Sequence, residues 1–317
     1  MTMFSKGTHN KTKPGRKTAL LVSLSMLALL APSSALGATA CLVMSRKIPP
    51  YEEASKGFRA SFSGKVFDFD MKGSVDGGLS ILPKMSEAGC DIIGALGSPA
   101  AKFLKIRVSD KPIVFAMVLN PAAEGIAGDN ITGVHLEPSP QSILAGIKRI
   151  LPNAKRVGVL YNSANSGRYI GDAQRAASGL GLELIARATK NTGEAIRLLS
   201  GIADKSDVIL MVPDPQTSSD SVFREMLRLS IQQGVPIFAL SQKHVSEGAL
   251  ATLATNYTSN GMQAGQIANR IAGGSNPGSI STEYANKAGW FVNLKAAERL
   301  GISVPDGIVR EAVEAYR

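Results

Sequence analysis

A nearly repeated phrase constrains the fold of this chain more than any other feature. DII at residues 91–93 is followed by KPIVFA at residues 111–116, and DVI at residues 207–209 is followed by VPIFA at residues 235–239. Each copy predicts a buried strand, a helix and a second buried strand that starts at a proline. Two copies predict two similar α/β lobes, with a small ligand bound in the cleft between them.

The N-terminus has the layout of a secretory signal peptide. A basic stretch without acids covers residues 6–17, an apolar run covers residues 19–31, and small residues follow over 33–38. The apolar run is too short to be a permanent membrane anchor. We predict a signal peptide over 1–37, cleaved after Gly37 or, as a second choice, after Ala40, and a soluble periplasmic or otherwise extracytoplasmic mature chain.

The positive charge of the chain is partly a property of this leader. The full sequence has 35 Lys and Arg against 25 Asp and Glu, a net charge of +10. Removing residues 1–37 takes away five basic and no acidic residues, which leaves 30 minus 25, or +5, without a basic block. Nucleic-acid binding would need clustered basic residues with stacking aromatics, so we predict no nucleic-acid partner.

The chain has two cysteines, Cys41 within a predicted strand and Cys90 at the start of another. An exported protein can form a disulfide, but the two positions are expected to be offset along neighbouring strands. Cys41 could also be a lipidated N-terminus, although Ala38 stands where a lipidation signal prefers a larger aliphatic residue. We expect two buried free thiols, with the disulfide and the lipid anchor as alternatives.

Strands alternate with helices along the mature chain, which predicts a parallel sheet with right-handed crossovers in each of two Rossmann-like lobes joined by a multi-strand hinge. The strand from Gly248 and the helix after it are expected to return to the first lobe. The lobes are therefore predicted at 38–136 plus 248–282 and at 137–247 plus 283–317. The predicted strands are 40–44, 65–71, 90–96, 113–118, 132–136, 156–161, 182–186, 208–212, 237–240 and 248–254. The predicted helices are 52–62, 79–88, one after Gly97 with Ser98 as N-cap, 138–151, 172–180, 192–203, 219–233 and 259–272. Residues 162–167 are predicted to form a loop.

No set of catalytic residues is recognisable. The sequence has no nucleophile elbow, no Walker loop and no glycine fingerprint after its first strand, so we predict a protein that is not an enzyme and uses no cofactor. His135 and His244 are far apart in sequence and are interpreted as ordinary surface or core histidines rather than metal ligands.

Polar residues recur where predicted strands end. In open parallel sheets these positions face the ligand crevice, although each residue alone could be a turn former or a cap. As a set, they predict the lining of a binding cleft. The candidate ligand-binding residues are Ser45, Tyr51, Gly97, Ser98, Asn120, Tyr161, Asn162, Ser163, Asp214, Thr217 and Ser241.

Asp214 is the most specific of these candidates. It stands between two prolines, and its carboxylate could accept a charge-assisted hydrogen bond from a ligand ammonium. The alternative is a helix N-terminal cap for the segment after Pro215. Tyr51 and Tyr161 could stack on a ligand, whereas Trp290 is predicted to lie in the core.

Several ordered motifs resemble one known family. KPIVFAMVLNPAAEG from Lys111, LPNAKRVGVLYNS from Leu151 and VPIFALSQKHVSEGALATLATNY from Val235 are similar to successive signatures of the ABC-transporter substrate-binding family that includes tryptophan- and tyrosine-binding lipoproteins. The resemblance implies a type I periplasmic binding protein fold, with three crossovers between lobes that close on a small solute.

Two positions depart from the family pattern. Asn120 and Ser241 stand where the family often has aspartate, while Asp214 keeps the family-type carboxylate. With Arg46 and Lys47 near the predicted cleft, these changes favour a ligand of less positive character, because buried charges must be matched.

These observations predict a solute-binding protein of an ABC-type uptake system. Its partners would be a small polar organic molecule, such as an amino acid or related carboxylate, and a permease with its ATPase at the cytoplasmic membrane. Amides near Ser98 and Ser163 would hold an anionic group and Asp214 a cationic one. The alternative is a periplasmic sensory module that transmits its bound state to a membrane receptor; an exported enzyme ranks below both.

Overall fold

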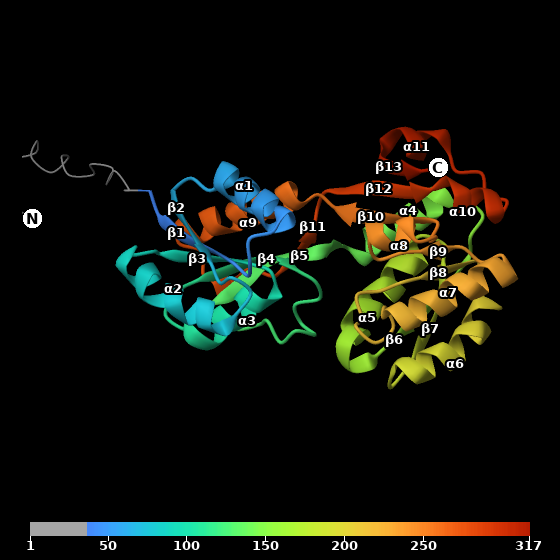
Figure 1. Ribbon diagram of the computed structural model, residues 1–317, viewed down its shortest axis with the longest axis horizontal. Coiled ribbons are helices and arrows are strands. Elements are labelled where there is room, and N and C mark those ends of the chain that lie inside the picture. Colours follow the sequence, from blue (N-terminus) through green and yellow to red (C-terminus); the bar gives the residue numbers. More distant parts are fainter. Residues whose placement is uncertain (1–36) are drawn as a thin grey trace, which may run out of the picture. The chain divides into compact units, whose positions relative to one another are not determined.

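The computed structural model describes residues 37–317, where helices and strands alternate through two lobes (Figure 1). The signal-peptide prediction lies outside the described residues except for Gly37. Between Gly37 and Arg317, no helix combines the length and the apolar character that crossing a membrane requires.

The first lobe is built on a sheet of six parallel strands in the order β2-β1-β3-β4-β5-β11. Helices α1 and α9 cover one face around Phe58, and α2 and α3 cover the other around Phe115. The elements are β1 (Thr39–Met44), α1 (Pro49–Ser61), β2 (Lys65–Asp70), α2 (Val75–Glu87), β3 (Ile92–Leu96), α3 (Ser98–Arg107), β4 (Ile113–Val118), β5 (Ile131–Pro138), α9 (Tyr257–Ala272), the short η1 (Pro277–Ser279) and β11 (Glu283–Ala285).

The second lobe repeats this plan in a seven-stranded sheet of order β7-β6-β8-β9-β10-β12-β13, in which only the β10–β12 pair is antiparallel. Trp290 is buried in its core, as predicted. The elements are α4 (Pro140–Ile150), β6 (Arg156–Tyr161), α5 (Ser163–Gly179), β7 (Glu183–Ala188), α6 (Thr192–Ala203), β8 (Val208–Leu210), α7 (Asp220–Gln233), β9 (Ile237–Phe238), α8 (Gln242–Ser246), β10 (Ala251–Thr255), β12 (Ala288–Asn293), α10 (Leu294–Arg299), α11 (Asp306–Glu311) and β13 (Ala312–Tyr316).

The predicted fold class, two Rossmann-like lobes with helix-flanked and largely parallel sheets, is confirmed. If the first five strands of each lobe are numbered along the chain, both sheets have them side by side in the order 2-1-3-4-5. The remaining strands, β11 in the first sheet and β12 and β13 in the second, follow the fifth strand. Parallel strands need crossover connections, and the helices between strands supply them.

The repeated phrase makes the same backbone hydrogen bonds in both lobes. The Pro112 carbonyl accepts from the Ile93 N–H at 2.9 Å, and the Pro236 carbonyl accepts from the Ile209 N–H at 2.9 Å. A proline can start these strands because its carbonyl, and not its missing N–H, is the group the neighbour needs. The repetition in sequence is therefore a repetition of strand pairing.

The aspartates of the phrase hold the start of the adjacent strand. Asp91 Oδ2 accepts from the Thr39 N–H at 2.9 Å, and Asp207 Oδ2 accepts from the N–H groups of Lys155 and Arg156, each at 2.8 Å. Arg156 also donates from its guanidinium to Asp207 Oδ1 at 2.8 Å. Each carboxylate thereby fixes the register between the first and third strands of its lobe.

The strand after Gly248 was predicted in the wrong lobe. β10 pairs with β9 and β12 and is the fifth strand of the second sheet, equivalent to β5 in the first. Its helix α9 does belong to the first lobe, where a Cβ on Gly261 would lie 1.8 Å from the Ala54 carbonyl oxygen of α1. β11, assigned to the second lobe by sequence, pairs with β5 in the first. The chain thus passes between lobes from β5 to α4, from β10 to α9 and from β11 to β12.

Helices α3 and α5 begin differently from the sequence prediction. Gly97, not Ser98, is the N-cap of α3, with φ 92°, and the hydroxyl of Ser45, the residue directly after β1, accepts from the Ala100 N–H at 3.0 Å. The predicted loop 162–167 is wrong because α5 starts at Ser163, directly after Asn162, whose side chain caps the Ala164 N–H. Turn-forming residues in that segment hid the first helical turns.

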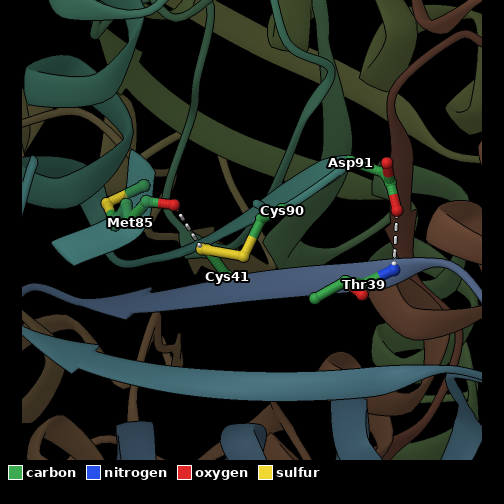
Figure 2. Close-up of a disulfide and its surroundings, with 5 residues drawn as sticks. All are labelled: Thr39, Cys41, Met85, Cys90 and Asp91. Atoms are coloured by element: carbon green, nitrogen blue, oxygen red, sulfur yellow. Dashed lines mark hydrogen bonds between the residues drawn. A yellow bond between two sulfur atoms is a disulfide. The ribbon is translucent and has the colours of Figure 1, made fainter. Parts of the chain in front are cut away.

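The expectation of two free thiols is wrong, since Cys41 and Cys90 form a disulfide with Cα atoms 5.6 Å apart (Figure 2). In register, Cys41 lies opposite Ile93. Cys90 comes before β3 begins, and the chain leaves the ladder there so that its side chain lies against Cys41. The two cysteines are therefore not offset along neighbouring strands in the way that the predicted strand boundaries implied.

Asp207 gives a testable dependence of stability on pH. The hydrogen bond from Arg156, with the two backbone N–H groups, lowers the pKa of Asp207 from 3.8 to about 2. Its stabilising contribution is therefore present above pH ~4 and is lost as the pH falls towards ~2. Asp207→Asn should lower the unfolding free energy by about 1 kcal/mol at neutral pH, allowing for solvent screening, and by almost nothing near pH 2.

Thermal unfolding followed by circular dichroism between pH 2 and 7 measures this difference. Asp204→Asn, which changes an exposed carboxylate on the same loop, is the matched control and should run parallel to the unmodified protein. A constant gap between the Asp207→Asn and unmodified curves at every pH would contradict the assignment.

Candidate functional site

Two cavities lie between the lobes and share a wall made of Glu137 and Tyr169. We call the first, of about 300 Å³, the apolar cavity and the second, of about 370 Å³, the polar cavity. Glu137 comes from β5 in the first lobe and Tyr169 from α5 in the second. Both cavities therefore depend on how the two lobes meet.

The apolar cavity is lined mainly by aliphatic and aromatic side chains. Leu119 and Leu136 come from the first lobe, and Ile143, Leu253 and Phe291 from the second. Its remaining lining residues are Pro138, Met211, Ala239, Leu240, Ser241, Gln242, His244, Thr252, Ala254, Thr255 and Tyr257, with Glu137 and Tyr169 at the shared wall.

Glu137 is a buried carboxylate with only 4% of its side chain exposed. It accepts two hydrogen bonds of 3.2 Å from the Asn120 N–H and lies 3.0 Å from His135 Nδ1. His135 and Glu137 are two residues apart on β5 and so lie on the same side of the strand. These partners support a negative charge inside the protein, where an unpaired carboxylate would be costly.

The polar cavity contains several further hydrogen-bonding side chains. His135 Nε2 lies 3.1 Å from Thr282 Oγ1, and the Tyr284 hydroxyl donates to Asp172 Oδ2 at 3.3 Å. Burial, followed by the negative charge of Glu137, raises the pKa of Tyr169; burial, followed by Asp172, raises that of Tyr284. Both phenols are therefore neutral at physiological pH and can donate hydrogen bonds. The cavity also contains Arg168 and the first residues of α5.

Asn120 joins the two lobes directly. Its Nδ2 group donates to the Asn165 carbonyl at 2.8 Å and to the Pro213 carbonyl at 3.1 Å, both in the second lobe. Its backbone has a positive φ of 47°, which asparagine and aspartate tolerate better than most residues. The side chain at this position is used for contact between lobes.

Three of the eleven predicted site residues line the two cavities. Asn120 and Ser163 line the polar cavity, and Ser241 lines the apolar one. Ser45, Tyr51, Gly97 and Ser98 lie together at the end of the first sheet, where the Ser45 hydroxyl donates to the Leu96 carbonyl at 2.9 Å. Burial raises the pKa of Tyr51.

The remaining predicted residues, Tyr161, Asn162, Asp214 and Thr217, lie at the corresponding end of the second sheet and line neither cavity. Asp214 is 1% exposed and accepts from the backbone N–H groups of Asn162, Gln216 and Thr217 at 2.7, 3.0 and 3.3 Å. Its carboxylate thus caps the turn over residues 215–217 and the start of α5, whereas the N-cap of the following helix, α7, is Ser219.

The two residues of the shared wall were missed by the sequence analysis. Glu137 was hidden because the predicted strand stopped one residue before it, at Leu136. The spacing His135-x-Glu137 could have revealed two polar side chains on one side of a strand. Tyr169 follows the segment that was predicted as a loop, so its place on the inner side of a helix was not visible.

Within the described residues 37–317, no group of three His, Cys, Asp or Glu side chains is placed to hold a metal ion. The arrangement instead offers a buried anion, neutral hydrogen-bond donors and an adjoining apolar space. It can bind a small molecule that carries a cation next to an apolar group.

Comparison with known proteins gives consistent similarities. The family described as "ABC transporter substrate binding protein" matches residues 65–316. A tyrosine-binding protein of Clostridioides difficile (strain R20291) is 25% identical over 275 residues, covering 80% of this chain and 79% of that protein.

Solved structures share the fold. The ligand-free, open structure of a substrate binding protein with adhesive properties from Clostridium difficile has a TM-score of 0.68 at 21% identity, over 88% of this chain and 99% of that one. An ABC domain from Streptococcus pneumonia in complex with L-Trp has a TM-score of 0.58 at 22% identity, with the same coverage.

The contact between lobes made by Asn120 is tested by Asn120→Asp. Aspartate keeps the backbone conformation, but its oxygens cannot donate to the carbonyls of Asn165 and Pro213. Loss of two hydrogen bonds should weaken the contact by about 1–3 kcal/mol and shift the ligand-free protein towards separated lobes. Small-angle X-ray scattering should show a larger radius of gyration.

Asn130→Asp is the matched control, because Asn130 also donates to two carbonyls, those of Val108 and Lys111, but within the first lobe. It should lower the thermal stability without changing the radius of gyration. An unchanged radius for Asn120→Asp would show that this residue does not hold the lobes together.

Proposed function

This chain belongs to the ABC transporter substrate-binding protein family, and we propose that its ligand is an amino acid with a large apolar side chain. Proteins of this family bind a small solute for an ABC transporter. Membership of this family does not favour the alternative function, a periplasmic sensory module for a membrane receptor. The observation that carries the proposal about the ligand is the buried carboxylate of Glu137, which lines both the apolar and the polar cavity.

Glu137 is the proposed partner of the α-ammonium group. Its oxygens already accept from Asn120, and a carboxylate has room for further donors. An ammonium ion beside it would form charge-assisted hydrogen bonds in surroundings of low dielectric constant. The cation would also compensate for the burial of the carboxylate.

The apolar cavity is the proposed place of the ligand side chain. At about 300 Å³ it lies at the small end of ligand pockets, which suits one amino-acid side chain. Leu119, Leu136 and Leu253 would contact the side chain, and Phe291 and Tyr257 would offer aromatic surfaces. The names of two relatives, one tyrosine-binding and one bound to L-Trp, support this choice.

The polar cavity is the proposed place of the ligand carboxylate. Ser163 and Ala164 at the N-terminus of α5 line it, and so does Arg168 one turn further along. Helix N-termini favour anions, and a guanidinium can bind a carboxylate with two hydrogen bonds. The earlier suggestion of an anionic group near Ser163 is retained, whereas the cationic group moves from Asp214 to Glu137.

The transporter partner is proposed to be a permease with its ATPase at the cytoplasmic membrane, and the site of action the periplasm or another extracytoplasmic space. The sequence supports export through the leader over residues 1–37. Ligand binding at groups from both lobes would stabilise one arrangement of the lobes, which a permease could recognise.

Isothermal titration calorimetry of the mature protein with L-amino acids tests the ligand class. Glu137→Gln keeps an acceptor for the Asn120 N–H but removes the negative charge. We expect it to weaken binding of the best amino acid by about 10–100-fold, the size of one charge-assisted hydrogen bond. Glu225→Gln, which alters an exposed ion pair with Arg228 on α7, should bind like the unmodified protein.

The N-acetylated form of the same amino acid identifies the group that Glu137 contacts. Because acetylation removes the cation, this analogue should bind the unmodified protein weakly and gain or lose little further with Glu137→Gln. Full affinity of Glu137→Gln for the free amino acid would refute the role of Glu137. A screen in which no apolar L-amino acid binds would refute the ligand class.

A further inference from the structure

The disulfide uses both cysteines of this 317-residue chain. Cys41 is fully buried and Cys90 is 6% exposed. The Cys41 sulfur also lies 3.9 Å from the carbonyl oxygen of Met85 on α2 (Figure 2). It is therefore enclosed between β1, the start of β3 and α2.

The residues just before Cys41 are part of the first sheet. Thr39 and Ala40 pair with Lys65 and Val66 of β2. The Thr39 N–H donates to the Asp91 carboxylate at 2.9 Å (Figure 2). The Thr39 carbonyl accepts from the Asp91 N–H at 2.8 Å. A chain that began at Cys41 would lose these contacts.

The residue before them is also fitted into the fold. The Ala38 carbonyl accepts from the Lys65 N–H at 3.1 Å. A Cβ on Gly64 would lie 1.8 Å from the Ala38 carbonyl oxygen, so glycine at position 64 leaves the space that the backbone of residue 38 occupies. The fold thus uses every residue from Ala38 to Cys41.

We propose that the exported protein matures with residues 38–40 retained and with Cys41 joined to Cys90, and that it carries no lipid on Cys41. Lipidation would require cleavage immediately before Cys41 and a bond from its sulfur to a glyceryl carbon. A sulfur in a disulfide already has both of its bonds, to Cβ and to the other sulfur. The two modifications of Cys41 exclude each other.

The disulfide forms by exchange with a protein disulfide of the cell envelope. One cysteine thiolate attacks a sulfur of that disulfide and releases one thiolate from it. The thiolate of the other cysteine then attacks the mixed disulfide, which releases the second thiolate. The two cysteines lose two electrons and two protons in total, and the oxidant becomes a dithiol.

Intact-mass spectrometry of the full chain exported by a bacterium tests the proposal. We expect a soluble protein that starts at Ala38, weighs two hydrogens less than the dithiol form and gains alkyl groups on both cysteines only after reduction. A membrane-bound chain that starts at a diacylglyceryl Cys41 would overturn the proposal. So would a chain with two thiols that alkylate without reduction.

Serine variants separate the two modifications by stability. If the disulfide is the native state, Cys41→Ser and Cys90→Ser should each lower the melting temperature by the same amount, on the order of 5–10 °C, and the double variant should lower it no further. All three variants should remain in the soluble fraction. A variant set in which only Cys41→Ser has an effect would contradict the disulfide.

Discussion

A buried carboxylate on the strand that leads from one lobe to the other is the constraint on which this architecture depends. Glu137 lies one residue before the end of β5, where the chain leaves the first sheet and enters the second lobe at α4. Its burial is tolerated because the Asn120 N–H and His135 face it. Asn120 in turn donates to two carbonyls of the second lobe. Asn120 therefore both stabilises the buried charge of Glu137 and connects the two lobes. As a result, the electrostatics of the site and the position of the lobes are coupled.

Most of the scaffold could be predicted from the sequence because its determinants are local. The repeated phrase combines an aspartate, an apolar run and a proline, and each of these has a short-range role in strand pairing that is the same in both lobes. The lobe of β10 could not be predicted this way. Its apolar residues could pack in either sheet. Only the three-dimensional structure, in which β10 is the fifth strand of the second sheet as β5 is of the first, shows to which lobe it belongs.

The site was less predictable because polar residues at strand ends can either contact a ligand or cap a neighbouring helix. Ser45, Gly97 and Asp214 follow the carboxyl ends of strands as expected, yet their oxygens accept hydrogen bonds from N–H groups at the starts of α3 and α5 within their own lobe. A residue type alone does not distinguish a cap from a ligand contact, since both need an exposed oxygen next to free N–H groups. Cys90 shows the same limit, because a strand boundary shifted by two residues turns an expected free thiol into a disulfide partner.

The departure from the family pattern at Asn120 also has a different meaning in three dimensions. In the sequence it suggested the loss of a negative charge from the site. In the structure the amide is needed as a donor to Asn165 and Pro213, a task that a carboxylate cannot perform. The negative charge is instead present nearby, on Glu137, and is accompanied by an apolar cavity on one side and a polar one on the other. The cleft is therefore asymmetric about a single buried carboxylate, with an apolar cavity on one side of it and a polar cavity on the other. The amino acid that we propose as the ligand has a matching arrangement around its α-carbon, where the cation lies between an apolar part and an anionic part.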